Sequence, residues 1–327
     1  MDYLYFDIEC ADGSHICSFG YVITDPQFNI IEKEDILINP RCEFKLGKYR
    51  KEPYIALAYR EKQFYAAPSF DKLYDKIGEI LSVPNRTILG HAIESDVEFL
   101  DKACDRYKKP RFDIRVYDTQ RIYEKHTDGA NVKSLEKIME ELNVDITQLS
   151  AHKSCDDAEM SMLTMREICG ATNTEISEYL GECEKYVVDR RHMEISYRGR
   201  AIRKFLSNIK RNAAKKDRKK IYIADVVEKI EVEKTREIMH AIYNAGYAFS
   251  FDIEKCDYSV TASGDPDPEY PNVKVLNYDR LSEMLGVEVT QNGNVGYTEN
   301  KSAGNSLKHF FDKAAERKNK NKNKTAK

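Results

Sequence analysis

Acidic residues at a two-residue spacing close the first apolar run of the chain. Asp7 and Glu9 end the segment YLYFDIEC, and a β-strand over this segment would place both carboxylates on one face. Two anions this close repel one another unless a cation lies beside them. The pair alone does not establish a metal site, because 55 of the 327 residues are acidic and such spacings also arise by chance.

Two later segments supply residues that could complete such a site. Asp96 lies in GHAIESDVEFL, at the expected start of a helix that follows a short strand. His152 and Asp157 lie in HKSCDDA, five residues apart at the start of another expected helix. Asp156 is an alternative to Asp157, and the spacing from His152 favours Asp157.

The order of these segments resembles a known family. The pattern is Asp7-x-Glu9, then Gly-His-x4-Asp96, then His152-x4-Asp157, with gaps of 87 and 61 residues. It is similar to the three motifs of the DEDDh 3′-to-5′ exonucleases, which include the proofreading subunit of bacterial replicative polymerases, RNase T and oligoribonuclease. The resemblance covers about residues 1–172, and a histidine at 152 rather than a tyrosine at 153 favours the DEDDh branch.

The resemblance implies a ribonuclease H-like exonuclease fold and a metal-dependent hydrolase. Two Mg²⁺ (or Mn²⁺) ions about 3.5–4 Å apart can activate the attacking water and neutralise charge on the leaving oxygen. Carboxylates are suitable ligands for these hard cations, and a histidine titrates near neutral pH and can act as general base. The implied catalytic residues are His152 and the four metal ligands Asp7, Glu9, Asp96 and Asp157.

The sequence departs from the family directly after Glu9. The usual Thr-Thr-Gly is replaced by Cys10-Ala11-Asp12-Gly13, and the first threonine normally helps to hold the terminal nucleotide. Cys10 could still present its backbone to substrate. His91 is a second candidate for substrate binding, with a structural role as the alternative.

The elements that must position these residues alternate between strand and helix patterns. Strands are predicted over 3–8, 16–23, 29–38, 87–89 and 116–117, and the first three form a meander. Apolar residues at helical spacing predict helices near 70–80, 97–104, 135–142 and 160–168. This interleaving predicts an α/β fold, a mixed sheet flanked by helices, for a domain over residues 1–180.

A second, smaller α/β domain is predicted over residues 218–290, after a basic helical connector over 181–217. Its sequence weakly resembles a BRCT domain through KIYI at 220–223, Ala245-Gly246, the segment 255–260 and Lys274-Val275-Leu276. Such a domain implies binding to proteins or DNA ends in repair or replication. An unrelated α/β module is the alternative.

The net charge of -3 conceals a strong segregation of charge. Residues 198–220 carry +10 and residues 308–327 carry +6, so the remainder carries -19. In the connector the candidates for nucleic-acid binding, with a solvated helix face as the alternative, are Arg198, Arg200, Arg203, Lys204, Lys210 and Arg211. Residues 291–327 are predicted to be a flexible basic tail. Within it, Leu307, Phe310 and Phe311 resemble a sliding-clamp-binding peptide, or form a short helix that docks on this protein.

Together these features predict a 3′-to-5′ exonuclease that acts on single-stranded or 3′-ended nucleic acid. DNA is preferred through the BRCT-like domain and the clamp-like tail; an exoribonuclease and a DNA-repair scaffold are the alternatives. Eight scattered cysteines without a C-x-x-C pair indicate reduced thiols. The start of the chain lacks the features of a signal peptide, and apolar runs are too short to cross a membrane, so we expect a cytoplasmic protein.

Overall fold

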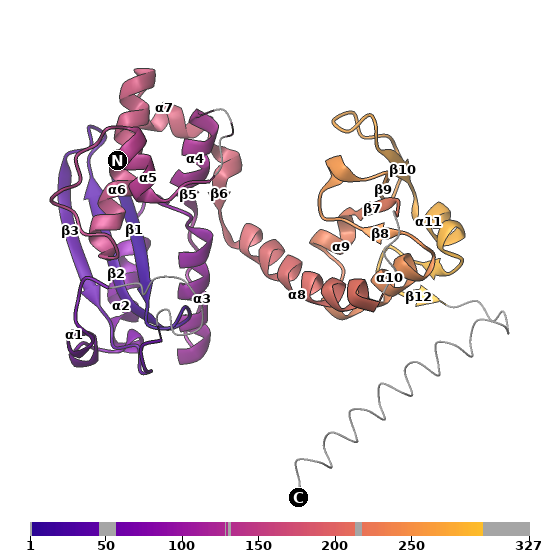
Figure 1. Cartoon of the computed structure of the whole chain (residues 1–327), viewed down its shortest axis with the longest axis horizontal. Helices are drawn as coiled ribbons and strands as arrows, with labels where there is room; N and C mark the ends of the chain where they lie inside the picture. Colours follow the sequence, from indigo (N-terminus) through magenta and orange to yellow (C-terminus); the bar gives the residue numbers. More distant parts are fainter. Residues whose placement is uncertain (1, 46–56, 128, 130–131, 213–217, 297–327) are drawn as a thin grey trace, which may run out of the picture. The chain divides into compact units, whose positions relative to one another are not determined.

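The chain divides into two units, Met1–Glu194 and Ile195–Lys327, each with its own sheet and core. The computed structural model describes residues 2–45, 57–127, 129, 132–212 and 218–296, without the side chains of 210–212. Figure 1 labels the elements along the chain. Among the described residues, no helix has the length and apolar character needed to cross a bilayer.

The first unit is built on a six-stranded mixed sheet. The order across the sheet is β3-β2-β1-β4-β5-β6. Strands β1 to β3 form an antiparallel meander, β1, β4 and β5 run parallel, and β6 is antiparallel to β5. The strands are β1 (Tyr3–Cys10), β2 (Ile16–Thr24), β3 (Ile30–Leu37), β4 (Thr87–Gly90), β5 (Val116–Asp118) and β6 (Val187–Val188). The predicted meander and the mixed α/β sheet are therefore confirmed.

Helices occupy the connections between these strands. Predicted helices near 70–80, 97–104, 135–142 and 160–168 are present, whereas three short helices before Arg190 carry too few apolar repeats to be recognised. The helices are α1 (Glu61–Ala66), α2 (Phe70–Leu81), α3 (Glu94–Tyr107), α4 (Thr119–His126), α5 (Leu135–Glu141), α6 (Ser154–Thr172), α7 (Ile176–Gly181) and the 3-10 turn η1 (Glu184–Tyr186).

Strand β1 is buried on both faces at the centre of this sheet. Tyr3 and Tyr5 join a core cluster with residues of α6, while Phe6, on the opposite face, stacks on Phe19 with ring centroids 5.4 Å apart. Helix α6 packs across β1 and β2 (Figure 1). Because both sides of β1 pack against other groups, the position of its polar end is fixed by a large apolar core.

The N-terminus of α6 approaches the sheet most closely at Gly20 of β2. A Cβ atom on Gly20 would lie 2.0 Å from the backbone nitrogen of Cys155 and 2.1 Å from the carbonyl carbon of Ser154. Gly20 pairs with Asp7 across the β1–β2 ladder. The missing side chain therefore allows the start of α6 to lie directly beside the polar end of β1.

The second unit contains four parallel strands in the order β10-β9-β7-β8. Its elements are α8 (Arg190–Asn212), which begins in the first unit, β7 (Lys220–Ile223), α9 (Ala224–Glu228), α10 (Val232–Asn244), β8 (Ala248–Phe249), η2 (Ile253–Lys255), β9 (Tyr258–Val260), β10 (Lys274–Leu276), α11 (Tyr278–Leu285), β11 (Glu288–Val289) and β12 (Val295–Gly296). Ile202 and Leu206 of α8 are buried in its core. One side of the basic helix is thus apolar and packed.

The observed divisions differ from the predicted ones at two places. Residues 181–194, predicted as connector, belong to the first unit and supply β6 to its sheet. Residues 291–296, predicted as tail, close an antiparallel pair between β11 and β12. Short strands of two residues carry no readable period, which explains both differences. The assignment of 218–290 to a BRCT-like domain stays a prediction.

Gly20→Ala should lower the free energy of unfolding. Overpacking typically costs about 1–3 kcal/mol, and we expect a loss at the upper end because the neighbouring atoms are backbone and cannot rotate away. Urea unfolding followed by circular dichroism measures the change. The control is Gly170→Ala in α6, where an added Cβ atom would meet nothing within 4 Å. A gain of about 0.5–1 kcal/mol is expected there. Equal losses in both variants would contradict the role of Gly20.

Candidate active site

The polar end of β1 carries the first two candidate ligands. Asp7 and Glu9 project from the strand face that also carries Tyr3 and Tyr5, as their even spacing predicts. A bulge at Glu9 and Cys10 ends the regular pairing with β2. Both acidic residues are only partly buried, whereas the apolar residues of β1 before them are fully buried.

Asp96 reaches this strand end from the first turn of α3. Its Oδ1 accepts a hydrogen bond of 3.1 Å from the backbone nitrogen of Ile8. The parallel pairing of β1 with β4 ends at Tyr5, so the Ile8 nitrogen lies beyond the last paired residue. Asp96 supplies the hydrogen-bond acceptor for this backbone nitrogen. Its carboxylate is buried, with 5% of the residue surface exposed.

His152 and Asp157 are brought to the same place by the start of α6. The backbone nitrogen of His152 donates to Asp157 Oδ2 at 3.1 Å, and its ring Nδ1 lies 3.3 Å from Glu9 Oε1. Donor atoms of Glu9, His152 and Asp157 all lie within 4.8 Å of one another. His152 has a φ of 60°, an unusual conformation for a residue other than glycine.

Asp156 is oriented differently from its neighbour. Its carboxylate lies 2.5 Å from Lys33 Nζ and 3.2 Å from Lys153 Nζ, and it accepts a hydrogen bond from the backbone nitrogen of Ser150. These contacts hold the pKa of Asp156 below its usual value despite burial. The Asp156 carboxylate is therefore paired with two lysine side chains. Asp157 has no such pairing among the described residues and stays the predicted ligand.

Polar contacts from β2 and β3 anchor the start of α6. Ser18 Oγ and Ser154 Oγ are 2.5 Å apart, and Asp35 Oδ1 accepts a hydrogen bond of 2.8 Å from the Cys155 nitrogen. Asp35 also accepts a hydrogen bond from Tyr59. Sequence reasoning missed Asp35 and Gly20, because each acts through a partner more than 100 residues away and neither belongs to a local pattern.

Mutual repulsion and burial dominate the electrostatics of the site. Burial raises the pKa of Asp7 well above its usual range, and the charges of Asp96, Asp157 and Glu9 raise it further. The pKa of Asp96 is also raised well above its usual value, mainly by burial. That of Asp157 is raised to about 7 by burial and by Glu9. Without a cation, these groups are driven to retain protons.

A bound cation would offset this repulsion. Asp7 Oδ2 is buried and has no hydrogen-bond partner among the described residues. A buried, unpaired carboxylate oxygen that faces other carboxylates is the environment expected of a ligand for a hard divalent ion. The residues present therefore fit the metal ions implied by the motif.

Neither of the two candidate substrate-binding residues is fully exposed. Cys10 is the buried last residue of β1, and burial raises the pKa of its thiol. His91 Nε2 lies 3.0 Å from the carbonyl oxygen of Lys133, and burial lowers the pKa of His91 to about 4. The structural alternative for His91 thus has a specific contact in its favour.

The basic residues of the connector lie in α8. Arg198 donates to the carbonyl oxygen of Ile230, and the Arg203 guanidinium lies 4.8 Å from the ring centroid of Phe251. Arg200 lies over the Tyr197 ring, and Lys204 is exposed. Arg198, Arg200 and Arg203 therefore all contact residues of their own unit. The side chains of Lys210 and Arg211, and the residues Leu307, Phe310 and Phe311, lie outside the described structure.

The first unit thus combines a mixed sheet flanked by helices with a cluster of carboxylates and one histidine at the end of β1. Residues 5–165 match the model of the exonuclease family, and this domain belongs to that family. The family is dependent on divalent metal ions, which agrees with the donor set at the end of β1. The predicted exonuclease domain is confirmed.

Several solved exonuclease structures are similar to part of this chain. One of them is a 3′-exonuclease structure that describes 3′-end specific recognition of a histone mRNA stem-loop. It has a TM-score of 0.44 at 15% identity, and the match covers 56% of this chain and 65% of that chain. E. coli exonuclease I in complex with a dA16 oligonucleotide has a TM-score of 0.43 at 17% identity, covering 55% and 42%. This chain thus spans less than two thirds of either structure. No curated protein sequence matches it.

Asp157→Asn should stabilise the metal-free protein at pH 8. Between pH 3.8 and about 7 the folded protein retains the Asp157 proton that the unfolded chain has lost, so this group makes stability fall as the pH rises. Asparagine does not titrate, so the variant should avoid this loss in the free energy of unfolding, which is ~4 kcal/mol at most. Urea unfolding at pH 5 and pH 8 in EDTA measures it.

Asp156→Asn is the matched control, and the expected change has the opposite sign. The folded-state pKa of Asp156 is lowered by Lys33, so its charge contributes stability at pH 8 that is lost as the pH falls through the folded value. Neutralising Asp156 should destabilise the protein at pH 8. A change of the same sign in both variants would contradict the assignment of repulsion to Asp157 and attraction to Asp156.

Proposed function

We propose that this protein is a 3′-to-5′ exonuclease that releases nucleotides from the 3′ ends of nucleic acid, with DNA as the preferred substrate. The observation that carries the proposal is the convergence of acidic side chains and one histidine from three separate segments at the end of β1. Membership of residues 5–165 in the exonuclease family supports it.

Two Mg²⁺ or Mn²⁺ ions would be held by Asp7, Glu9, Asp96 and Asp157. Bound there, they would supply charge for activation of water and for stabilisation of the leaving oxygen. The buried Oδ2 of Asp7, which lacks a partner among the described residues, and the raised pKa values of Asp7, Asp96 and Asp157 support this ligand set.

His152 would take the proton of the attacking water. Its side chain is 42% exposed, so the ring is accessible to water, while the backbone is tied to Asp157. With a proton on Nδ1 directed to Glu9, Nε2 is the ring nitrogen left to accept another. Glu9 would thus orient the base in addition to binding metal, and its contact raises the pKa of His152.

The choice of DNA rests on the second unit and the C-terminal segment. A BRCT-like domain over 218–290 and a clamp-binding peptide at 307–311 would place the enzyme among replication or repair proteins. An exoribonuclease is the alternative, and a comparison of DNA and RNA degradation, described below, distinguishes the two. All eight cysteines are unpaired thiols, which supports a reducing compartment, and we propose the cytoplasm.

Asp7→Asn should abolish metal-dependent degradation of nucleic acid. The test incubates 5′-labelled single-stranded DNA and RNA of matched sequence with purified protein in Mg²⁺, Mn²⁺ or EDTA. A ladder of shortened 5′-labelled products on DNA, absent in EDTA, is expected. The control, Asp25→Asn, neutralises a carboxylate in the β2–β3 turn and should retain activity. Full activity of Asp7→Asn refutes the ligand set, and degradation of RNA alone identifies the exoribonuclease.

The rate should rise with pH as His152 loses its proton. The reference pKa of histidine is about 6.5, and Glu9 raises the pKa of His152. We therefore expect the rate to increase between about pH 6 and pH 8. His152→Ala should lower the rate by about 10²–10⁴ and flatten the profile. His126→Ala, at the end of α4, is the control and should preserve both. Identical profiles for wild type and His152→Ala would remove His152 from the mechanism.

A further inference from the structure

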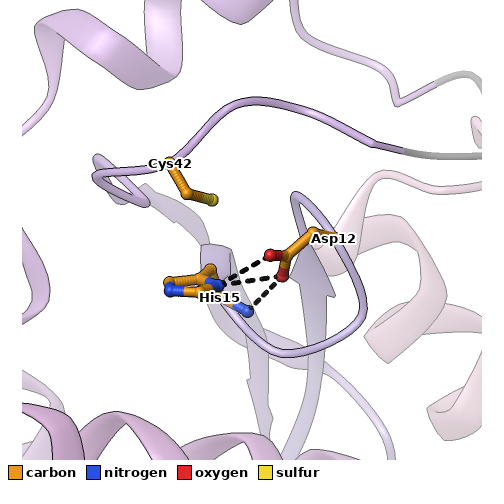
Figure 2. A group of neighbouring side chains, drawn as sticks. All are labelled: Asp12, His15 and Cys42. Carbon is orange, nitrogen blue, oxygen red and sulfur yellow. Dashed lines mark hydrogen bonds and ion pairs between the residues drawn. The ribbon is translucent and has the colours of Figure 1, made fainter. Parts of the chain in front are cut away.

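A second cluster of potential ligands lies in the loops next to the candidate active site. Asp12 and His15 belong to the turn between β1 and β2, and Cys42 follows β3. One ligand atom from each lies within 4.8 Å of the other two. Figure 2 shows the three side chains pointing toward one another, with the sulfur directed to the Asp12 carboxylate and the His15 ring.

The Asp12–His15 half of this cluster is held in place by the turn itself. Asp12 Oδ2 lies 2.8 Å from His15 Nδ1, and Asp12 Oδ1 accepts hydrogen bonds from the backbone nitrogens of Ser14 and His15. The turn is closed by a bond of 2.8 Å from the Ala11 nitrogen to the His15 oxygen. Gly13, with a φ of 79°, allows this tight conformation.

The Cys42 half is tied to the same turn by backbone contacts. The nitrogen of Lys45 donates to the oxygen of Ala11 at 2.8 Å. The Cys42 carbonyl accepts a hydrogen bond of 3.1 Å from Tyr65 Oη. The first contact joins the two segments through their backbones, and the second holds the Cys42 backbone to α1, so both segments are in place before any ligand binds.

We propose that Asp12, His15 and Cys42 bind one Zn²⁺ ion, or a chemically similar first-row transition metal, with water in the fourth position. Nitrogen, oxygen and thiolate donors together are the set that zinc takes, whereas Mg²⁺ and Mn²⁺ prefer oxygen alone. Two donors about 2.0–2.1 Å from zinc at the tetrahedral angle lie about 3.3 Å apart. The Asp12–His15 distance of 2.8 Å needs an opening of only a few tenths of an ångström.

The surroundings of Cys42 support a metal-binding thiolate. All eight cysteines lie in the described structure, and Cys42 is the one that is not buried. Its sulfur lies within 4.8 Å of the Asp12 and His15 ligand atoms. A Zn²⁺ ion bound among them would displace the thiol proton and be held by the thiolate.

The position of this zinc site gives it a structural role for the active centre. Asp12 is three residues beyond Glu9, and the turn it closes leads into β2, which carries Gly20. Zinc would join this turn to the segment after β3. It would thereby restrict movement of the chain directly after the candidate catalytic carboxylates, without being one of the catalytic ions.

Cobalt binding to the full-length, reduced protein tests the site. Co²⁺ replaces zinc in such sites, and a thiolate ligand gives a charge-transfer band in the near ultraviolet that oxygen and nitrogen ligands do not give. In excess Mg²⁺, we expect this band to reach its maximum at one Co²⁺ per chain and to disappear when Zn²⁺ is added. No band in the native protein overturns the proposal.

Matched variants assign the band to these residues. Loss of a group that only supports a metal ligand typically costs about 10–100-fold in affinity, so losing a ligand in Cys42→Ser or His15→Ala should weaken Co²⁺ binding more than about tenfold. Cys256→Ser, in the second unit, and Asp157→Asn, in the candidate active site, should retain the band and the affinity. Circular dichroism shows whether each variant is folded. A band that persists in folded Cys42→Ser overturns the assignment.

Discussion

The close approach of α6 to β2 at Gly20 is the constraint on which the active centre depends. With Cys155 and Ser154 backbone atoms about where a Cβ would stand, the first turn of α6 lies against the strand that pairs with β1. Asp157 and the preceding His152 can then face Asp7 and Glu9. The hydrogen bonds of Ser154 to Ser18 and of Cys155 to Asp35 fix the direction of the helix after the missing side chain has allowed its approach.

This packing brings together carboxylates that destabilise one another. Asp7, Asp96 and Asp157 all have raised pKa values because their carboxyl groups are shielded from water and lie near other carboxylates, and one oxygen of Asp7 has no partner among the described residues. The apolar core around Tyr3, Tyr5 and α6 must therefore hold the strand end in a conformation that the metal-free site opposes. A cation bound there would remove a repulsion that the core prevents the side chains from relieving by moving apart.

The sequence was sufficient where the signal was local. Alternation in β1 placed Asp7 and Glu9 on one face, and the sequence pattern placed Asp157 at the start of a helix, where α6 begins. It was insufficient where a role depends on distant partners. Gly20 lies in an ordinary apolar strand, and Asp35 lies in the charged segment EKED, so only the folded chain shows that both support α6. Strand β6, two residues long, was missed because it has no measurable period.

Two donor sets of different chemistry lie at successive positions of one chain segment. Glu9 belongs to an oxygen-rich centre that suits hard cations, whereas Asp12, three residues later, faces nitrogen and sulfur. The bulge at Glu9 and Cys10 separates the two, because it ends the regular β1–β2 pairing and starts the turn that carries Asp12 and His15. The segment Cys10-Ala11-Asp12-Gly13, where the sequence departs from the exonuclease motif, therefore coincides with the turn that creates the second donor set. Asp12 is the member of this segment that belongs to the proposed zinc site, and the bulge places it beyond the regular pairing that positions Asp7.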